Sequence, residues 1–464
     1  MRRAQDVAER ALAACGADEC AVIVDESDGS FLRWAGNSMT ANGTGRERRV
    51  TVVAIVGGKT GRAVGTVSCG GPAADAAGEV ARAAERAARR AVPDPAAPAL
   101  PQGREHGWDE PPADPPPDVL DELVPDLGRT FRRARAERRL LYGYAERRVT
   151  TTYLATTSGT RARHVQPAGV LDLTAKTSDH SASARAGTGT TGRWDVAGMH
   201  DRLRRRLGWS RRRVDLPPGS YEVLLSPSCV ADLMIHLYGA AGAADALGGH
   251  GPFAADPGGT GPGGTGLGVG ERLTDQPLTL SGDPAAAGLE CAPFLVARSS
   301  GPVVSVFDNG VPLRPTTWIS GGVLTALVHT RASARQAGHP VTPWIDNLEL
   351  RGEGPGRTLP EMVAATRRGL LLGSLWYLRE VDPRSLLLTG LTRDGVHLVE
   401  NGEIVGAVNG FRFNESPVRL LERVTEVGRT ERTLPREWGD HFTRVAMPPL
   451  RIAGFTMSAV SATP

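Results

Sequence analysis

The chain contains the stretch Ser228-Cys229-Val230-Ala231-Asp232-Leu233-Met234-Ile235-His236-Leu237-Tyr238-Gly239-Ala240-Ala241 shortly after the apolar run Tyr221-Glu222-Val223-Leu224-Leu225. The run is typical of a short strand, and the stretch predicts a helix that starts at Pro227 or Ser228, with Ser228 as its N-cap and Asp232 in its first turn. A hydrolytic zinc site needs about three protein ligands and usually a carboxylate that moves protons. This helix offers His236, whereas Leu237 and Ala241 supply neither. We therefore interpret His236 as a core or interface histidine.

Other motifs, together with this helix, resemble the TldD/PmbA family of peptidases, also called the modulator of DNA gyrase family. The matching segments follow one another in the family's order, at residues 16–24, 32–38, 57–66, 307–312, 321–324, 399–404 and 449–455. Active subunits of that family carry H-E-x-x-x-H on the helix, where this chain has Leu237 for the glutamate and Ala241 for the second histidine. They also draw a zinc ligand from a late cysteine, whereas residues 441–448 hold none and Cys291 is the last cysteine here. The resemblance is therefore to the metal-free, PmbA/TldE-like branch.

This resemblance implies a function for the chain as one part of a complex. It implies a non-catalytic, TldE-type subunit of a cytoplasmic zinc metallopeptidase that hydrolyses unfolded or short peptides, including leader removal from modified peptides. A separate TldD-like subunit would hold the zinc through two histidines and a cysteine, so this chain has no expected catalytic residue, metal ligand or cofactor. It would complete a closed chamber in a hetero-oligomer and could add an extended peptide to a sheet edge.

Two other classes of function stay open at this point. The chain could be a non-enzymatic binding or regulatory scaffold, or a stand-alone hydrolase with an unrecognised site. Cys229 at a helix start is a weak candidate nucleophile, because His236 lies two turns away. A metal site shared by His236 and His250 is a second weak candidate.

The composition indicates which partners and which cellular compartment to expect for this chain. The formal net charge is +3, which gives no case for nucleic-acid binding. Five cysteines match no zinc-binding spacing, and their odd number argues against a disulfide framework, so we expect mostly buried, reduced thiols. Residues 1–14 lack the apolar core of a signal peptide, and no run reaches the length of a membrane span. We expect a cytoplasmic protein that binds no membrane.

The chain divides into three predicted domains of α+β class. Residues 1–95 predict an α/β domain with helices at 4–15 and 73–92 and strands near 20–25, 31–35, 48–56 and 62–68. Residues 96–117 form a Pro/Ala-rich linker or surface loop. Residues 118–215 predict a central α+β domain with helices at 118–140 and 195–209, strands at 142–156, 163–174 and 179–187, and a solvated basic stretch at 211–213.

Residues 216–464 predict a mainly antiparallel β-rich domain, and the family implies that its sheet is barrel-like. Strands are expected at 221–225, 293–297, 303–307, 323–328, 386–391 and 395–399, and helices at 228–241, 360–371 and 416–424. Asn309-Gly310 and Asn401-Gly402 are hairpin signals. The glycine-rich pattern at 261–266 lacks a preceding strand and reads as a surface loop. A set of large apolar residues is assigned either to the core or to a partner interface: Trp344, Leu348, Trp376, Tyr377 and Leu378.

Overall fold

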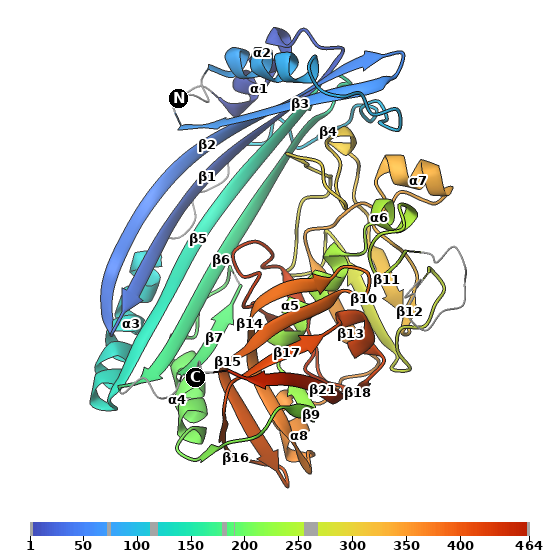
Figure 1. The fold of residues 1–464 in the computed structure, drawn as a ribbon. Helices are drawn as coiled ribbons and strands as arrows, with labels where there is room; N and C mark the ends of the chain where they lie inside the picture. Colours follow the sequence, from blue (N-terminus) through green and yellow to red (C-terminus); the bar gives the residue numbers. More distant parts are fainter. Residues whose placement is uncertain are drawn as a thin grey trace.

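The computed structural model describes residues 3–71, 76–111, 119–178, 183–189, 191–254 and 268–461. A long curved sheet lies along one side of the molecule, and a β-rich lobe packs against it (Figure 1). The expected linker end at 112–117 and the glycine-rich pattern at 261–266 lie outside the described residues. The architecture is of the α+β class, as the sequence predicted.

The long sheet has the strand order β3-β2-β1-β5-β6-β4, with β7 also paired to β6. The strands are β1 (Glu19–Ala35), β2 (Ser38–Gly58), β3 (Gly61–Gly70), β4 (Glu105–His106), β5 (Arg139–Thr156), β6 (Arg161–Thr177) and β7 (Ser183–Thr188). Antiparallel pairing of β1 with β5 joins the segments 1–95 and 118–215 in one sheet. The predicted boundary between these segments therefore does not separate two sheets.

Strand β1 replaces the two shorter strands expected at 20–25 and 31–35. The intervening Glu26 to Ser30 stretch is polar and breaks the apolar pattern. In this stretch, ion pairs link β1 to β2. Arg46 Nη2 lies 2.6 Å from Asp28 Oδ2, and Arg48 pairs with Glu26. Opposite charges on neighbouring strands stabilise a ladder by a few tenths of a kcal/mol to about 1 kcal/mol per pair.

Helices cover one face of the long sheet at both of its ends. Helices α1 (Ala4–Ala14) and α2 (Ala77–Ala88) pack on one end through small residues and valines, and α3 (Val119–Ala136) and α4 (Val196–Trp209) pack on the other. The side chains of Val22 and Leu32 on β1 belong to these two cores. Ile23 belongs to the opposite face, where it packs with Phe294 and Phe307 of the lobe. Alternation along β1 thus turns one face toward the helices and the other toward the lobe.

The lobe contains a closed barrel, which confirms the predicted barrel-like sheet. Strands β14, β9, β21, β17 and β15 follow one another, and β14 also pairs with β15, so the ring closes. Their bounds, with those of the attached strands, are β8 (Arg213–Val214), β9 (Gly219–Leu225), β14 (Arg368–Asp382), β15 (Leu387–Glu400), β16 (Glu403–Val408), β17 (Phe411–Glu415), β18 (Val424–Val427) and β21 (Leu450–Val460). Phe411, Phe413 and Phe455 are fully buried in its core.

A second sheet of the lobe has the order β12-β11-β10-β13-β20-β19. Its strands are β10 (Leu278–Gly282), β11 (Thr316–Ser320), β12 (Val323–Leu324), β13 (Leu348–Gly352), β19 (Glu431–Thr433) and β20 (Val445–Met447). The remaining helices are α5 (Pro227–Gly239), α6 (Ala243–Leu247), η2 (Val306–Asp308), α7 (Arg331–Ala337), α8 (Leu359–Ala364) and α9 (Pro417–Leu421). Helix α5 packs between this sheet and the barrel, in a core that both share.

Several predictions of helices and strands in the lobe are wrong. Residues 293–297 and 303–307 form no strand. They form loops and the start of η2, and their apolar side chains pack against the long sheet. The helix expected at 360–371 ends at Ala364, and residues 370–372 instead pair with β9. Apolar residues here fit either structure, and pairing within the barrel decides between them. The expected strand at 323–328 ends at Leu324.

The two asparagine-glycine signals have different outcomes. Asn401 and Gly402 have φ values of 51° and 82° and join β15 to β16, so this hairpin is confirmed. Asn309 and Gly310 form a tight turn in which the N–H of Val311 donates to Asp308 O at 3.0 Å, with no hairpin. The Asn309 side chain is fully buried and accepts from Ala297 N at 2.7 Å. The Asn309 side chain therefore stabilises this loop through hydrogen bonds to backbone groups, where the sequence predicted a strand ladder.

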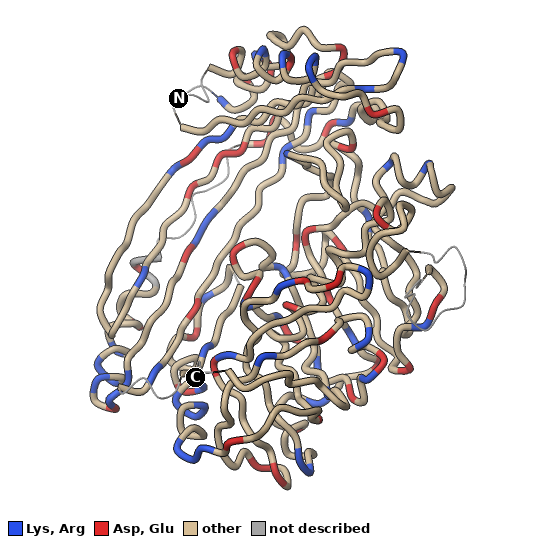
Figure 2. Tube along the Cα trace, viewed as in Figure 1, with Lys and Arg blue, Asp and Glu red and all other residues tan. Residues whose placement is uncertain are grey.

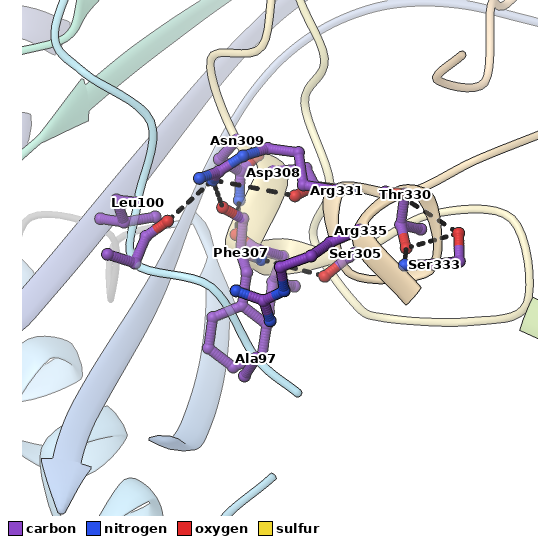
Figure 3. Close-up of polar contacts among 12 residues, drawn as sticks. Ala97, Leu100, Ser305, Phe307, Asp308, Asn309, Thr330, Arg331, Ser333 and Arg335 are labelled. Carbon is purple, nitrogen blue, oxygen red and sulfur yellow. Dashed lines mark hydrogen bonds and ion pairs between the residues drawn. The ribbon is translucent and has the colours of Figure 1, made fainter. Parts of the chain in front are cut away.

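Asp308 and Arg331 hold the lobe against the segment between α2 and β4 (Figure 3). Arg331 Nη1 donates to Ala99 O at 2.7 Å and to Phe307 O at 3.3 Å, and its backbone N–H donates to Asp308 Oδ2 at 3.0 Å. Burial raises the pKa of Asp308. The first part of the predicted linker, residues 96–100, is thus packed, with Ala97 and Leu100 buried. Part of the motif at 307–312 consequently has a structural role at this junction.

Candidate functional site

Strand β9 leads directly into helix α5, which the sequence singled out. Ser226 is the N-cap, because its side chain accepts from Cys229 N at 3.4 Å, and Pro227 occupies the first turn. The prediction that Ser228 is the N-cap is wrong, and Asp232 lies beyond the first turn. Ser228 Oγ instead donates to Leu434 O at 2.8 Å, which ties the helix to a loop more than two hundred positions later. Proline has no N–H to leave unpaired, so Pro227 begins the helix, as one of the two predicted starts, and Ser226 rather than Ser228 caps it.

Leu237 and Ala241 lie in the apolar core of the lobe. Their exposed fractions are 2% and 3%. Leu237 packs with the residues that fill the space between α5 and the two sheets. Within the described ranges, no group of three or more His, Cys, Asp and Glu side chains is arranged to hold a metal ion. The interpretation of this helix as metal-free stays a prediction.

His236 is half-buried against the loop between β19 and β20. Its ring meets Trp438 edge-on, with 5.1 Å between ring centroids, and its Nε2 is buried without a hydrogen-bond partner among the described residues. Burial lowers the pKa of His236 to about 4, so the imidazole is neutral at pH 7. His250 is exposed, beside the undescribed part of the glycine-rich loop. His236 is therefore a packing residue in this structure.

Cys229 lies at the start of α5 but lacks the exposure and the lowered pKa of an activated nucleophile. Its side chain is fully buried, and its thiol donates to Leu372 O at 3.5 Å. Burial raises the pKa of Cys229 to about 12, so the thiol stays protonated at neutral pH. Cys20 and Cys291 are also buried, whereas Cys15 and Cys69 are half-buried, and all five are free thiols. Burial of most of the thiols agrees with the expectation from the sequence.

Asp232 anchors the 434–444 loop, the segment between β19 and β20, to helix α5. Its carboxylate is fully buried and accepts from the backbone N–H groups of Arg436 at 3.0 Å, Glu437 at 2.9 Å and Trp438 at 3.4 Å. Burial raises the pKa of Asp232 to about 7, against the lowering effect of these donors. The sequence analysis missed this role, although a single acid inside an otherwise apolar helix was a signal for it.

A cleft of about 790 Å³ lies between the long sheet and the 434–444 loop. Side chains from four strands of the sheet line it on one side, including Arg33, Tyr144, Glu146, Arg148, Asp172 and Arg185. The residues that line it on the side of the lobe include Trp376, Arg436, Glu437, Asp440, His441 and Arg444. A smaller hollow of about 240 Å³ shares Thr443 and Arg444 with it. The cleft is thus adjacent to α5 through the loop that Asp232 holds.

Strand β6 has an edge beside this cleft that is only partly paired by the described strands. Strand β4 pairs with it only at Arg161 and Ala162, and β7 pairs with it only from Leu171 to Lys176. Among the described strands, none pairs with residues 163–170 on that side. Residues 168–170 also line the cleft. Open N–H and C=O groups at a sheet edge can pair with an added extended segment.

The large apolar residues considered for a partner interface have different positions. Leu348 and Leu378 are buried in the core of the lobe, which excludes them as exposed anchors. Trp344 stacks on Tyr238, with 3.9 Å between centroids and 16° between planes. Trp376 lies at the cleft, and Tyr377 is 51% exposed. Tyr377 is the member of this set that a partner could contact most fully.

Comparisons with known proteins agree with the fold. The family described as PmbA/TldA metallopeptidase C-terminal domain matches residues 218–459. TldE from Thermococcus kodakarensis has a similar structure, with a TM-score of 0.78 at 17% identity over 97% of this chain and 99% of that chain. A candidate modulator of a DNA gyrase from Thermotoga maritima has a TM-score of 0.74 at 15% identity over 97% and 99%. A protein of the same description from Bacteroides thetaiotaomicron has a TM-score of 0.72 at 15% identity over 98% of each chain.

At these identities the solved structures show a shared fold alone. No curated protein sequence matches the chain significantly. Within the described residues, no helix has both the length and the apolar character needed to cross a membrane. The matched family domain covers more than half of the chain and contains β9, α5, the barrel and the 434–444 loop. The chain therefore belongs to the PmbA/TldD family.

Proposed function

We propose that this chain is a TldE-type, non-catalytic subunit of a cytoplasmic zinc metallopeptidase complex. The complex would hydrolyse unfolded or short peptides, including leader segments of modified peptides. A TldD-like partner would hold the zinc, and this chain would enclose and bind the peptide. The observation that carries the proposal is the contrast at α5. A cleft is bordered by the loop that Asp232 of α5 holds, while Leu237 and Ala241 are packed into the core.

The described residues around α5 do not fit a zinc ion. His236 is the histidine of this helix, and its neighbours toward the cleft are Trp438 and Glu437 from the anchored loop. Trp438 cannot ligate, because its indole nitrogen is a donor only. Tetrahedral zinc needs about four ligands, of which about three come from the protein at a catalytic site. No catalytic step is therefore assigned to this chain.

The cleft supports a role in holding an extended peptide. Residues from four strands of the sheet line it, and three of them, 168–170, belong to the stretch of β6 that no described strand pairs on its outer side. Main-chain pairing at such an edge is independent of sequence, which suits varied peptide substrates. A folded protein would not fit between the sheet and the lobe without moving one of them.

The chain should contain no stoichiometric zinc when purified alone, and should form a complex with a TldD-like chain. Elemental analysis after dialysis measures the metal, and light scattering on the mixed and separate chains measures the complex. A TldD-like chain whose H-E-x-x-x-H glutamate is replaced by glutamine is the matched control, since it should assemble without turnover. About one zinc per isolated chain would overturn the non-catalytic proposal. Failure to associate, with both chains folded, would favour a regulatory scaffold.

Replacing His236 with alanine should leave peptide hydrolysis by the complex within about twofold of wild type. A catalytic group would cost a hundredfold or more. Because the folded pKa of His236 is lowered to about 4, its stabilising effect is present above about pH 6.5 and is lost as the pH falls toward 4. Between pH 6.5 and pH 5, the free energy of unfolding of the wild type should therefore fall by about 2 kcal/mol more than that of His236→Ala. Urea denaturation at both pH values checks this, and a hundredfold loss of turnover with assembly intact would contradict it.

A further inference from the structure

We infer that the cleft between the long sheet and the 434–444 loop binds carboxylate groups of an extended peptide, and so makes the complex prefer acidic peptides. This inference rests on the proposed function, because it names the chemistry of the peptide that the cleft would take. It starts from the ion pairs on the cleft wall. Figure 2 shows that both signs of charge occur along the long strands and the lobe, so the pairing of individual side chains is decisive.

The acidic side chains of the cleft are mostly neutralised by neighbours. Glu146 pairs with Arg148, and Asp172 accepts from Arg185 Nε at 2.7 Å. Glu437 accepts from Arg379 Nη1 and from the N–H of Tyr377, both at 2.9 Å. Asp440 is the acid of the cleft for which the described residues supply no ion-pair partner, and it is exposed.

Two arginines of the cleft keep their charge unpaired. Arg33 on β1 contacts the ring of Tyr144, with 5.1 Å from its guanidinium carbon to the ring centroid. Arg444 donates through Nε to the backbone oxygen of Asp346 at 3.0 Å. In the described part of the chain, neither has a carboxylate within 4.0 Å. Both guanidinium groups therefore keep N–H donors for a ligand.

Arg436 adds a third guanidinium with unfilled donors. It lies over the ring of Trp376, 4.4 Å from the centroid, and its Nε is buried without a hydrogen-bond partner among the described residues. The nearest carboxylates are Asp172 at 3.9 Å and Asp394 at 3.8 Å, beyond hydrogen-bond length. Stacking fixes the plane of a guanidinium and leaves its edge for a carboxylate.

These three arginines come from both walls of one cleft. Arg33 belongs to the long sheet, and Arg436 and Arg444 belong to the loop that Asp232 anchors. Arg436 has Asp172 and Asp394 within 4.0 Å, and Asp440 is the acid of the cleft left to face Arg33 and Arg444, so the unpaired groups leave a small excess of positive charge. Bidentate guanidinium–carboxylate pairs are the strongest polar contacts that such walls can make. Arg436 also bridges the sheet and the lobe, so Arg33 and Arg444 are the residues that test ligand binding without loosening this contact.

Binding of labelled extended peptides to the full chain, alone and with its TldD-like partner, tests the inference. The peptides share one length and differ at alternate positions, which carry Asp, Asn or Lys, and the Asp peptide is made with a free and with an amidated C-terminus. Fluorescence polarisation should show the Asp peptide binding at least tenfold more tightly than the Asn peptide at low salt. The preference should shrink at high salt, because partly exposed pairs are screened. Equal binding of the free and amidated forms would assign the contact to side chains, and a loss on amidation would assign it to the terminal carboxylate.

The double variant Arg33→Gln/Arg444→Gln should lose about tenfold in affinity for the Asp peptide and keep its affinity for the Asn peptide. Arg212→Gln is the matched control, since Arg212 is exposed and lies outside the cleft lining. Equal binding of Asp and Asn peptides, or an unchanged preference in the double variant, would overturn the inference. If neutral peptides are still bound and hydrolysed by the complex in that case, the proposed function stands. If no peptide binds and no complex forms, both fail.

Discussion

Leu237→Glu should prevent stable folding of the lobe rather than restore a zinc site. Leu237 is 2% exposed and packs within the core around α5, so the new carboxylate would be buried without a partner. Burying an unpaired ionisable group costs several kcal/mol, while a whole domain is stable by only about 5–15 kcal/mol. We expect little soluble protein, or a fall of several kcal/mol in the free energy of unfolding. Adding Ala241→His should worsen this, because Ala241 is equally enclosed.

Denaturant unfolding and elemental analysis check this prediction together. Leu237→Met is the control, because a volume-conserving apolar exchange usually costs less than about 1.5 kcal/mol. A Leu237→Glu/Ala241→His protein with wild-type stability and one bound zinc would show that α5 turns these positions to the cleft. That outcome would remove the structural basis for calling the chain non-catalytic.

Asp232→Ala should detach the 434–444 loop and destabilise the lobe by roughly 3 kcal/mol or more. The change leaves three backbone N–H groups without their acceptor, and each unsatisfied buried donor costs about 1–3 kcal/mol unless water reaches it. Limited proteolysis should cut near Arg436, and peptide binding should fall, because Arg436 and Arg444 leave their positions. Asp232→Asn keeps the size and one acceptor oxygen and should lose less. If the Asp232→Ala protein were as stable and as protease-resistant as the wild type, this would contradict the role of Asp232 in anchoring the loop.

The raised pKa of Asp232 also predicts a pH dependence. An acid whose folded pKa is about 7 binds a proton more tightly in the folded protein than in the unfolded chain. Its stabilising effect is present below about pH 4 and is lost as the pH rises through 7, at about 1.4 kcal/mol per pH unit. Wild-type stability should therefore fall between pH 5 and 8 relative to that of Asp232→Asn. Urea unfolding of both proteins at the two pH values measures the difference, and parallel curves would contradict it.

Local patterns predicted much of the fold. Helices α1, α2 and α4 follow the spacing of small and apolar side chains, and Asn401-Gly402 forms the expected hairpin because both positions adopt positive φ. These features depend on near neighbours in the chain. The order of weak motifs identified the family, and the barrel that the family implies is present.

Elements that depend on distant partners were predicted less well. Strand β14 looked helical at Leu370 and Leu371, and only its pairing with β9 and β15 makes it extended. The middle of β1 looked like a loop, because ion pairs with β2 replace apolar contacts there. Tertiary context outweighs propensity when a short segment fits two structures almost equally well.

Some features of the candidate site follow from the sequence, and others depend on distant parts of the chain. The sequence by itself determined that α5 carries His236 with Leu237 and Ala241, because identities at known spacing need no coordinates. Only the tertiary structure decided that Leu237 and Ala241 face a core, that Asp232 holds a loop two hundred positions away, and that Arg33 and Arg444 line one cleft. Burial and charge pairing are set by residues that the chain brings together from far apart. Periodicity along one segment carries no information about such partners.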